Sequence, residues 1–330
     1  MPRIALLASH NVASGIFLPK HLEKLRSLGE LVVNPDTVRP TKERMIELIQ
    51  GAEIAITSWG CSFIDEDALR QAPDLKMVAH AAGSVKPIIS DALIERGIRV
   101  SSANDALGVG VAETALGLTI AAVKRMWPLS QSTRKGGWEY GKDKIREMYE
   151  LKIGVVGAGR AGRHYIRLLQ QFDVDVLLYD PIVSAAEAAS IGTVKVELDQ
   201  LLAESDVISI HAPSIPETFH MFNATAFKMM KDDCVLINTA RGTLINEPDL
   251  CEELAKGRFT ACLDVTEPEP PMPDHPFRKL DNCILIPHIA GAVNNGLHRL
   301  GKFSTDEVAR YLSRQPLEGE VDLGSLHVIA

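Results

Sequence analysis

The sequence predicts an α/β protein built from two Rossmann-like domains, each with a doubly wound parallel sheet. Short apolar runs that fit buried parallel strands alternate with helical patterns along the whole chain. This alternation starts again around a glycine-rich turn at Gly157. With 330 residues the chain is long enough for two separate cores. We therefore expect one domain from residues 1–104 with 289–330, flavodoxin-like, and a second from residues 105–288.

The individual elements follow from local apolar patterns and from turn residues between them. In the first domain, strands are expected at Ile4–Ala8, Leu31–Val33, Ile54–Thr57, Met77–Ala79 and Arg99–Ser101, with helices at Lys20–Leu28, Thr41–Gln50 and Asp65–Gln71. A long helix is expected after Asn104, and an amphipathic helix at Gly296–Tyr311. The second domain adds strands at Ile153–Val156, Val174–Leu178, Val207–His211, Val235–Asn238, Thr260–Asp264 and Cys283–Pro287.

The glycine-rich turn has the G-x-G-x-x-G spacing of a dinucleotide site. Gly157 permits a tight turn, Gly159 lets the backbone approach a pyrophosphate, and Gly162 lets helix and strand pack closely. The helix that follows would present free N–H groups to the phosphates. Asp180 ends the next strand, where a carboxylate accepts hydrogen bonds from ribose hydroxyls and disfavours a 2′-phosphate, so NAD is expected. An ordinary glycine-rich turn would leave this combination unexplained.

Bulk properties exclude several other classes of protein. The net charge of −8, without a basic stripe, argues against nucleic acid as a partner. The five cysteines are scattered, which indicates reduced thiols rather than a zinc site, and no metal is expected. No apolar run suggests a membrane span, and the N-terminus lacks the pattern of a signal peptide. We expect a cytoplasmic protein that does not bind membranes.

Polar and charged residues follow three of the strands predicted for the second domain. They lie in the segments Asn238–Gly242, Asp264–Pro270 and Pro287–Gly291. Ligands of such sheets bind outside the carboxyl ends of the strands. One arginine, one carboxylate and one histidine could therefore meet over a nicotinamide. A 2-keto acid needs such a set: a cation for its carboxylate, an acid for its carbonyl oxygen, and a partner that orients the acid.

With these motifs the sequence resembles the D-isomer-specific 2-hydroxyacid dehydrogenases, the family of phosphoglycerate and D-lactate dehydrogenases and glyoxylate/hydroxypyruvate reductases. The resemblance extends from roughly Ala52 to Gly291 and is carried by Gly157–Gly162 with Asp180, Asp206–Pro213, Asn238–Gly242, Asp264–Pro270 and Pro287–Ile289. It implies an active-site cleft between the two domains, the first being the substrate domain and the second the NAD-binding domain. It also implies reversible NADH-dependent reduction of a 2-keto acid to the D-2-hydroxy acid.

The resemblance further implies roles for individual residues. Arg241 would bind the substrate carboxylate, His288 would be the general acid and base, and Glu269 rather than Glu267 would be its partner. Asp264 would hold the nicotinamide carboxamide. Arg241 and His288 are also expected to line the cofactor, together with Arg160, Ala161, Pro181, His211, Ala212, Pro213, Thr239, Ala240 and Gly291. Those expected at the substrate are Arg241 and His288 with Ala82, Gly83 and Ser84. Each of the three catalytic candidates, taken alone, could instead be a solvated or structural side chain.

The chain departs from the family pattern in its first domain. The family often has G-x-G-x-D-x-x-D where this chain has His80–Pro87, and no cation for a phosphate follows the third strand at Ser58–Cys61. The substrate is therefore left open between glyoxylate, hydroxypyruvate and a bulkier apolar keto acid suited to Trp59. His80 could touch a ligand but, like His211 and His275, is given no catalytic role. The chain also ends without the regulatory extension of many phosphoglycerate dehydrogenases.

Assembly and the rival function are also expectations. The family implies a homodimer formed through the NAD-binding domain, with Trp138 near the interface. The alternative to an enzyme is an NAD-sensing binding protein, like the transcriptional corepressors built on the same fold. Turnover of a keto acid would separate the two.

Overall fold

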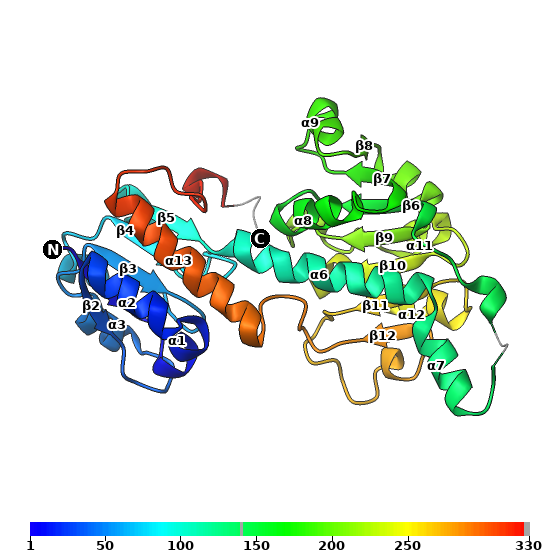
Figure 1. Ribbon diagram of the computed structural model, residues 1–330, viewed down its shortest axis with the longest axis horizontal. Helices are drawn as coiled ribbons and strands as arrows, with labels where there is room; N and C mark the ends of the chain where they lie inside the picture. Colours follow the sequence, from blue (N-terminus) through cyan, green and yellow to red (C-terminus); the bar gives the residue numbers. More distant parts are fainter. Residues whose placement is uncertain (139–140, 327–330) are drawn as a thin grey trace. The chain divides into compact units, whose positions relative to one another are not determined.

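The computed structural model describes residues 1–138 and 141–326 of the chain. The chain divides into two compact units, Met1–Leu107 with Ala292–Ala330 and Gly108–Gly291, which we call unit 1 and unit 2. Their boundaries lie three residues after the expected ones at 104/105 and 288/289. Each unit contains one parallel sheet with helices (Figure 1), so the predicted fold class is confirmed.

The sheet of unit 1 has five parallel strands in the order β2-β1-β3-β4-β5, the flavodoxin-like arrangement. The strands are β1 (Arg3–Leu6), β2 (Glu30–Val33), β3 (Ile54–Thr57), β4 (Met77–His80) and β5 (Arg99–Ser102). The helices are α1 (His10–Ile16), α2 (Pro19–Leu28), α3 (Lys42–Ile49), α4 (Glu66–Gln71), α5 (Asp91–Glu95) and α13 (Leu297–Leu312).

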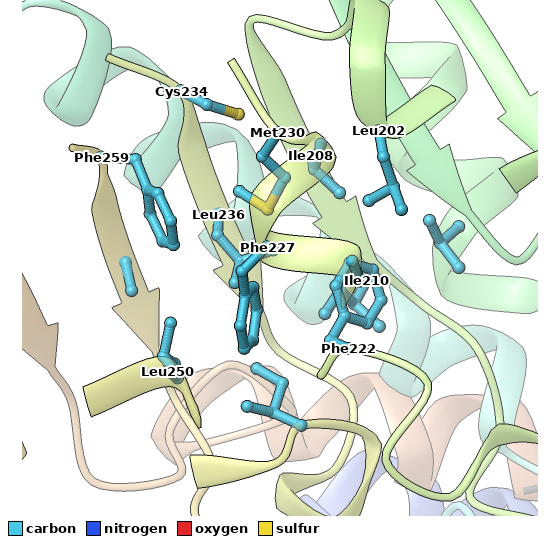
Figure 2. Close-up of a cluster of buried hydrophobic side chains, with 14 of the residues drawn as sticks. Leu202, Ile208, Ile210, Phe222, Phe227, Met230, Cys234, Leu236, Leu250 and Phe259 are labelled. Atoms are coloured by element: carbon cyan, nitrogen blue, oxygen red, sulfur yellow. The ribbon is translucent and has the colours of Figure 1, made fainter. Parts of the chain in front are cut away.

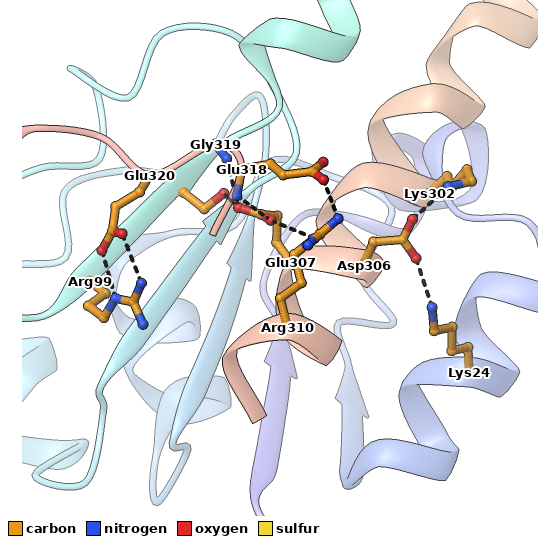
Figure 3. Close-up of polar contacts among 10 residues, drawn as sticks. Lys24, Arg99, Lys302, Asp306, Glu307, Arg310, Glu318, Gly319 and Glu320 are labelled. Carbon is orange, nitrogen blue, oxygen red and sulfur yellow. Dashed lines mark hydrogen bonds and ion pairs between the residues drawn. The ribbon is translucent and has the colours of Figure 1, made fainter. Parts of the chain in front are cut away.

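A buried carboxylate ties α13 to the sheet of unit 1 (Figure 3). Glu307 on α13 is 1% exposed, and its Oε2 accepts hydrogen bonds from Ser101 Oγ at 2.5 Å and from the N–H of Gly319 at 3.0 Å. Its Oε1 accepts the N–H of Glu318 at 3.0 Å. Because three donors converge on one side chain, β5 is held to α13 and to the segment after α13, although Ser101 of β5 lies 206 residues before Glu307 in the sequence.

The sheet of unit 2 has seven parallel strands in the order β12-β11-β10-β9-β6-β7-β8, a Rossmann arrangement whose strand order reverses between β6 and β9. The strands are β6 (Tyr149–Val156), β7 (Asp173–Tyr179), β8 (Val194–Lys195), β9 (Val207–Ile210), β10 (Val235–Asn238), β11 (Thr260–Leu263) and β12 (Cys283–Leu285). The helices are α7 (Met126–Arg134), α8 (Arg160–Leu169), α9 (Ala185–Ser190), α10 (Leu198–Glu204), α11 (Ala224–Met229) and α12 (Glu247–Ala255), together with most of α6 (Asn104–Val123).

Both faces of this sheet are covered by apolar side chains, as expected for parallel strands. On one face, Phe222, Phe227 and Phe259 pack with side chains of β9 and β10 (Figure 2). A second cluster contains Ala112 and Ala115 of α6, the wholly buried Tyr165 of α8 and apolar residues of the same strands. This packing fixes the positions of the carboxyl ends of the strands. The loops that follow these strand ends carry the candidate site.

Helix α6 is unusually apolar for its length. By length and composition alone it could cross a membrane, a criterion that the core helix of a soluble protein also meets. Its most apolar window is 44% buried, and Ala112, Ala115 and Val123 lie in the core of unit 2. A core helix passes the same test, and packing against the sheet accounts for the apolar composition of α6.

Candidate active site

Two glycines of the G-x-G-x-x-G turn lie where no side chain would fit. Gly157 follows β6 with φ +94°, and a Cβ there would lie 2.8 Å from the backbone nitrogen of Ala212, which follows β9. A Cβ on Gly162 would lie 2.1 Å from the carbonyl oxygen of Gly157. The turn is thus compressed at the point where the strand order of the sheet reverses, and glycine is required for that closeness.

The middle glycine has the opposite surroundings. A Cβ on Gly159 would meet no heavy atom of residues 1–138 and 141–326 within 4 Å, so this face of the turn is open there. Gly159 is also the N-cap of α8, and none of the described side chains caps that helix end. Arg160 and Ala161 are the first two residues of α8, where backbone N–H groups lack intrahelical partners. An open backbone face beside an uncapped helix N-terminus fits the pyrophosphate of a dinucleotide.

Asp180 comes directly after β7, and its carboxylate binds the backbone of this turn. Its Oδ2 accepts the N–H of Ala158 at 2.8 Å, and its Oδ1 accepts the N–H of Ile182 at 2.8 Å and of Val183 at 3.2 Å. Arg163 Nε donates to the carbonyl oxygen of Ala158 at 2.9 Å. The Ala158 residue is therefore fixed at both its N–H and its carbonyl, and Pro181 lies in the turn that Asp180 closes.

The imidazole of His211 lies in the core of unit 2. It packs 5.2 Å from the ring of Tyr165, and its Nε2 lies 2.9 Å from Ser209 Oγ. Burial lowers the pKa of His211 to about 4, so the ring is neutral near pH 7. At this position the backbone that leads into Ala212 and Pro213, rather than the imidazole, lies beside the glycine turn.

Two buried polar atoms of predicted cofactor residues have no hydrogen-bond partner in the described part of the chain. They are Nδ1 of His211 and Oγ1 of Thr239, and Thr239 lies in the loop after β10. Next to it, Asn238 Oδ1 accepts the N–H of Ala240 at 3.0 Å and Asn238 Nδ2 donates to the carbonyl of Arg241 at 2.8 Å, which fixes the loop. An unpaired buried hydroxyl is costly, and a bound cofactor with polar groups would supply its partner. The residues present thus fit a dinucleotide.

The loop that carries His288 is held by Asp264. The carboxylate is 2% exposed and accepts the N–H of Ile289 at 2.7 Å and of Ala290 at 3.0 Å, while the Asp264 carbonyl accepts the N–H of His288 at 2.9 Å. Burial raises the pKa of Asp264. His288 has φ +50°, a conformation that non-glycine residues adopt only when their surroundings enforce it. Both carboxylate oxygens thus bind backbone; contact with a nicotinamide carboxamide stays a prediction.

The structure brings Glu269 and His288 into direct contact. His288 Nδ1 lies 2.6 Å from Glu269 Oε2, and Glu269 Oε1 accepts the N–H of Thr266 at 3.2 Å. Because a carboxylate accepts hydrogen bonds, Nδ1 carries the proton of this pair, and Nε2 is the ring nitrogen left for a substrate. The imidazole is 51% exposed. Glu267, by contrast, uses its backbone N–H, which donates to Glu247 Oε1 at 2.8 Å.

Arg241 begins the segment after Ala240 and has an exposed side chain. Its Nη1 donates to the carbonyl of Ala240 at 2.6 Å, and within residues 1–138 and 141–326 no hydrogen bond or ion pair joins it to Glu269 or His288. The segments themselves do meet: a Cβ on Gly242 would lie 2.2 Å from the carbonyl carbon of Thr266. The Arg241 segment is therefore packed against the backbone of the loop that carries Glu269.

In unit 1, the residues predicted to meet substrate form a loop whose carbonyls are turned toward buried serines. Ser58 Oγ donates to the carbonyl of Ala81 at 2.9 Å, and Ser102 Oγ lies 2.5 Å from the Gly83 carbonyl and 3.2 Å from that of Ala82. In a planar trans peptide the N–H of the next residue points the opposite way. The N–H groups of residues 82–84 therefore face away from the serines, and successive backbone N–H groups turned in this way are suited to an anion.

His80 lies beneath this loop and not in it. It is 3% exposed, and its Nδ1 lies 2.9 Å from Thr57 Oγ1. Burial lowers the pKa of His80 to about 4, so the imidazole is a neutral part of the unit 1 core. Among the described residues, no group of three or more His, Cys, Asp or Glu side chains could hold a metal ion.

Several contributors to the site were not identified from the sequence. They are Ser58 and Ser102 under the loop of unit 1, Arg163 beside the glycine turn, and Glu247 next to Glu267. Each acts through a backbone group of another segment. The sequence signal closest to any of them is the position of Ser58 and Ser102 at or next to a predicted strand end.

Comparisons with known proteins agree with this geometry. The family model named D-isomer specific 2-hydroxyacid dehydrogenase, NAD binding domain, matches residues 116–290 of this sequence. These residues include every loop of unit 2 described above. A D-3-phosphoglycerate dehydrogenase of Archaeoglobus fulgidus is 34% identical over 264 residues, covering 80% of this chain and 50% of that protein. A glyoxylate reductase of Korarchaeum cryptofilum is 31% identical over 295 residues, covering 88% and 89%.

Solved structures extend the likeness to the whole fold. D-lactate dehydrogenase with NAD+ from Lactobacillus jensenii has a TM-score of 0.79 at 20% identity and covers 97% of this chain and 99% of that chain. At this identity the similarity concerns the fold alone. The chain spans 50% and 59% of the length of two D-3-phosphoglycerate dehydrogenases that it matches, from Archaeoglobus fulgidus and Methanocaldococcus jannaschii.

Proposed function

We propose that this chain, which belongs to the D-isomer specific 2-hydroxyacid dehydrogenase family, catalyses the reversible NAD-dependent reduction of a 2-keto acid to the D-2-hydroxy acid. The observation that carries the proposal is the 2.6 Å contact between His288 and Glu269 on loops of the NAD-binding unit. This contact engages Nδ1 and leaves Nε2 of a half-exposed imidazole available to a substrate.

The dinucleotide, when bound, supplies or accepts the hydride at C2 of the substrate. His288 holds a proton at Nε2 and gives it to the carbonyl oxygen during reduction, or takes it from the hydroxyl during oxidation. Glu269 fixes the ring orientation through Nδ1 and stabilises the protonated imidazole. Arg241 provides the planar, permanently charged group that binds a carboxylate in two-point fashion.

The residues that would hold the cofactor lie around the glycine turn and the strand ends of unit 2. Gly159 and the first N–H groups of α8 would receive the pyrophosphate, and Asp180 would accept from the ribose hydroxyls. Thr239 would pair its unpartnered hydroxyl with a polar group of the cofactor. The remaining candidates, Arg160, Ala161, Pro181, Ala212, Pro213, Ala240 and Gly291, would line this surface mainly with backbone.

For the substrate we propose a small, unphosphorylated 2-keto acid. The N–H groups of Ala82, Gly83 and Ser84 are suited to a carboxylate, as argued above. Residues Ser58–Cys61 contain no cation that could bind a phosphate. Proteins similar to this chain include the glyoxylate reductase of Korarchaeum cryptofilum and the phosphoglycerate dehydrogenases named above. A hydroxypyruvate reductase of Thermotoga maritima is also similar to it.

We further propose a cytoplasmic homodimer that forms through unit 2. Trp138, Met126 and Tyr149 leave 73%, 51% and 58% of their surface exposed; Met126 and Trp138 lie between α6 and β6, and Tyr149 is the first residue of β6. Large apolar side chains grouped in one segment are typical of a protein interface. Light scattering at micromolar concentration tests this assembly, and a monomer would contradict it.

The activity is tested by following NADH oxidation across a panel of keto acids that includes glyoxylate, hydroxypyruvate, pyruvate, longer apolar keto acids and 3-phosphohydroxypyruvate. We expect turnover of at least one unphosphorylated acid, lost in His288→Ala, with the phosphorylated acid a poor substrate. Binding of NADH without turnover of any keto acid would instead support the NAD-sensing binding protein. If the phosphorylated acid had the highest kcat/KM of the panel, the proposed substrate class would be wrong but the proposed reaction would still hold.

A further inference from the structure

The buried carboxylate of Glu247 connects two segments of the candidate site. Glu247 is the first residue of α12, on the segment that follows Arg241, and it is 8% exposed. Its Oε1 accepts the N–H of Glu267 at 2.8 Å. Glu267 lies two residues before Glu269, so this hydrogen bond reaches directly into the loop that orients His288.

The other oxygen of the same carboxylate faces the far end of that loop. Glu247 Oε2 lies 3.3 Å from Nε2 of His275. His275 Nδ1 accepts the N–H of Phe277 at 3.3 Å, which places the proton of the neutral ring on Nε2, toward the carboxylate. The proline-rich loop from 267 to 275 is therefore anchored at both ends on one side chain.

Packing reinforces this anchor. Gly242 lies against the peptide that joins Thr266 and Glu267, where a Cβ would come within 2.7 Å of the Glu267 nitrogen. The Arg241 segment thus meets the loop twice, once through this backbone contact and once through Glu247. Between the two contacts the loop has little freedom to move away from the Arg241 segment.

An ordinary acidic residue at a helix N-terminus would look different. Such a residue is usually exposed and stabilises its own helix through the dipole. Glu247 is buried, and it accepts from a loop that is separate from its helix. Burial also raises the pKa of Glu247 to about 6, which shows that placing the carboxylate here is unfavourable for its charged form. Burying a carboxylate is unfavourable unless hydrogen bonds compensate for it, and the bonds of Glu247 to the loop are ones that an exposed acid would not make.

We propose that Glu247 is a positioning residue of the active site, which fixes the loop from 267 to 275 so that Glu269 stays within hydrogen-bond distance of His288. Glu247 touches neither substrate nor cofactor in this role and acts through the Glu267 N–H and through His275. The kinetic part of the test rests on the proposed dehydrogenase function. The structural part does not.

The kinetic test compares three variants with the wild type. Glu247→Ala removes both anchors, Glu247→Gln keeps an oxygen that accepts the Glu267 N–H, and Glu252→Ala removes an exposed acid from the same helix. We expect kcat of Glu247→Ala to fall by about tenfold or more, since small displacements of a catalytic group cost up to roughly 10²-fold. The Kd for NADH should stay unchanged in all three.

Rescue by the conservative change separates positioning from a general loss of stability. We expect Glu247→Gln, which keeps only the anchor to the Glu267 N–H, to retain more of kcat than Glu247→Ala, and Glu252→Ala to behave like the wild type. An unchanged kcat in Glu247→Ala, or an equal fall in Glu252→Ala, would overturn the proposal. Should Glu247→Ala fail to fold, His275→Asn tests the other anchor, because its Oδ1 can still accept the Phe277 N–H while the shorter side chain withdraws from Glu247. We expect a lower kcat for it, and no change would count against the proposal.

A double-mutant cycle tests whether Glu247 acts through Glu269. In the Glu269→Gln background, Glu247→Ala should cause much less further loss of kcat than it does in the wild type, because both changes disturb the same contact with His288. Fully multiplicative losses would show that Glu247 acts by some other route.

Hydrogen–deuterium exchange supplies a measurement that needs no turnover. The amide of Glu267 should exchange slowly in the wild type and in Glu252→Ala, and faster in Glu247→Ala. If no keto acid were turned over while exchange still rose in Glu247→Ala, the proposed reaction would fail and the anchor would stand. If the exchange rate of the Glu267 amide were the same in Glu247→Ala as in the wild type, the proposed anchor would be contradicted, whatever the activity of the enzyme.

Discussion

The N–H of Ala158 donates to the Asp180 carboxylate at 2.8 Å, so the residue expected to receive the cofactor ribose also holds the glycine-rich turn in place. Both roles need the same side chain. A change at Asp180 therefore acts on cofactor choice and on the shape of the turn together, and the two effects are separable by the choice of substitution.

We predict a strong preference of the wild type for NADH over NADPH, because a carboxylate repels a 2′-phosphate. Asp180→Asn removes the charge but keeps an oxygen that accepts from backbone, and it should narrow the ratio of kcat/KM values by roughly tenfold, the equivalent of about 1.4 kcal/mol. Asp180→Ala should in addition raise KM for both cofactors, since the turn loses its anchor. Equal kcat/KM for NADH and NADPH in the wild type would contradict this prediction.

His288→Ala should lower kcat by roughly 10²- to 10⁴-fold, the usual contribution of a general acid. The Kd for NADH, measured by fluorescence titration, should change little, because the glycine turn lies on other loops. Glu269→Gln should also lower kcat, since the imidazole loses the carboxylate at 2.6 Å.

Glu267→Gln is the matched control for Glu269→Gln. It leaves the Glu267 backbone N–H, the group that contacts Glu247, in place. We expect kinetics close to the wild type. If kcat fell further in Glu267→Gln than in Glu269→Gln, the partner of His288 would be Glu267 and not Glu269.

Arg241→Ala should raise KM for the keto acid and lower kcat as well, because a guanidinium binds the substrate carboxylate both before and during hydride transfer. Arg241→Lys should recover only part of the loss, since an ammonium lacks the planar two-point geometry. Initial rates over a range of keto-acid concentrations separate the two parameters. A fall in kcat at constant KM would argue against carboxylate binding.

Acid should destabilise the protein through two buried histidines. Burial lowers the pKa of His80 and of His211 to about 4, whereas an unfolded histidine titrates near about 6.5. Protonation thus favours the unfolded chain, so the stabilisation is complete above about pH 6.5 and is lost as the pH falls toward 4, by roughly 3 kcal/mol for each histidine. Urea unfolding at a series of pH values measures this. His80→Gln should flatten the decline, and the exposed His10→Gln should leave it as it is.

Glu307→Ala should destabilise unit 1. It leaves the N–H groups of Glu318 and Gly319 and the hydroxyl of Ser101 without their acceptor, and each unsatisfied buried group costs about 1–3 kcal/mol. We expect a loss of about 3 kcal/mol or more in urea unfolding. Glu318→Ala, which removes an exposed carboxylate nearby, should cost much less. Equal losses in the two variants would argue against a special role for Glu307.

The strands were predictable because a buried parallel strand is a continuous apolar run. Ile54–Thr57 and Val235–Asn238 match β3 and β10 at both ends. Strand β4 extends one residue further than predicted, to His80, because its ladder continues into a buried polar residue. Helices α1, α5, α7 and α9–α12 were not located from the sequence. Each has at most nine residues, so its apolar period is short, and α1 and α7 also lack a side chain that caps the N-terminus in the described part of the chain.

The candidate site was predictable only to the level of its loops. Strand ends in a parallel sheet gather at one edge, so Arg241, Glu269 and His288 could be grouped without coordinates. The partner of each group could not be derived in this way. Asp264 binds backbone of the His288 loop, and Glu247 accepts from Glu267, because pairings between loops depend on their three-dimensional course and leave no local pattern in the sequence.

The serines under the loop at 82–84 have an implication for how substrate preference could change. If main-chain N–H groups bind the anion, the side chains at Ala82, Gly83 and Ser84 are free to vary, and the affinity for a carboxylate is encoded in Ser58 and Ser102 instead. Engineering could then alter substrate preference by replacing loop side chains, while any change to the Ser58 and Ser102 hydroxyls would weaken the binding of every keto acid alike.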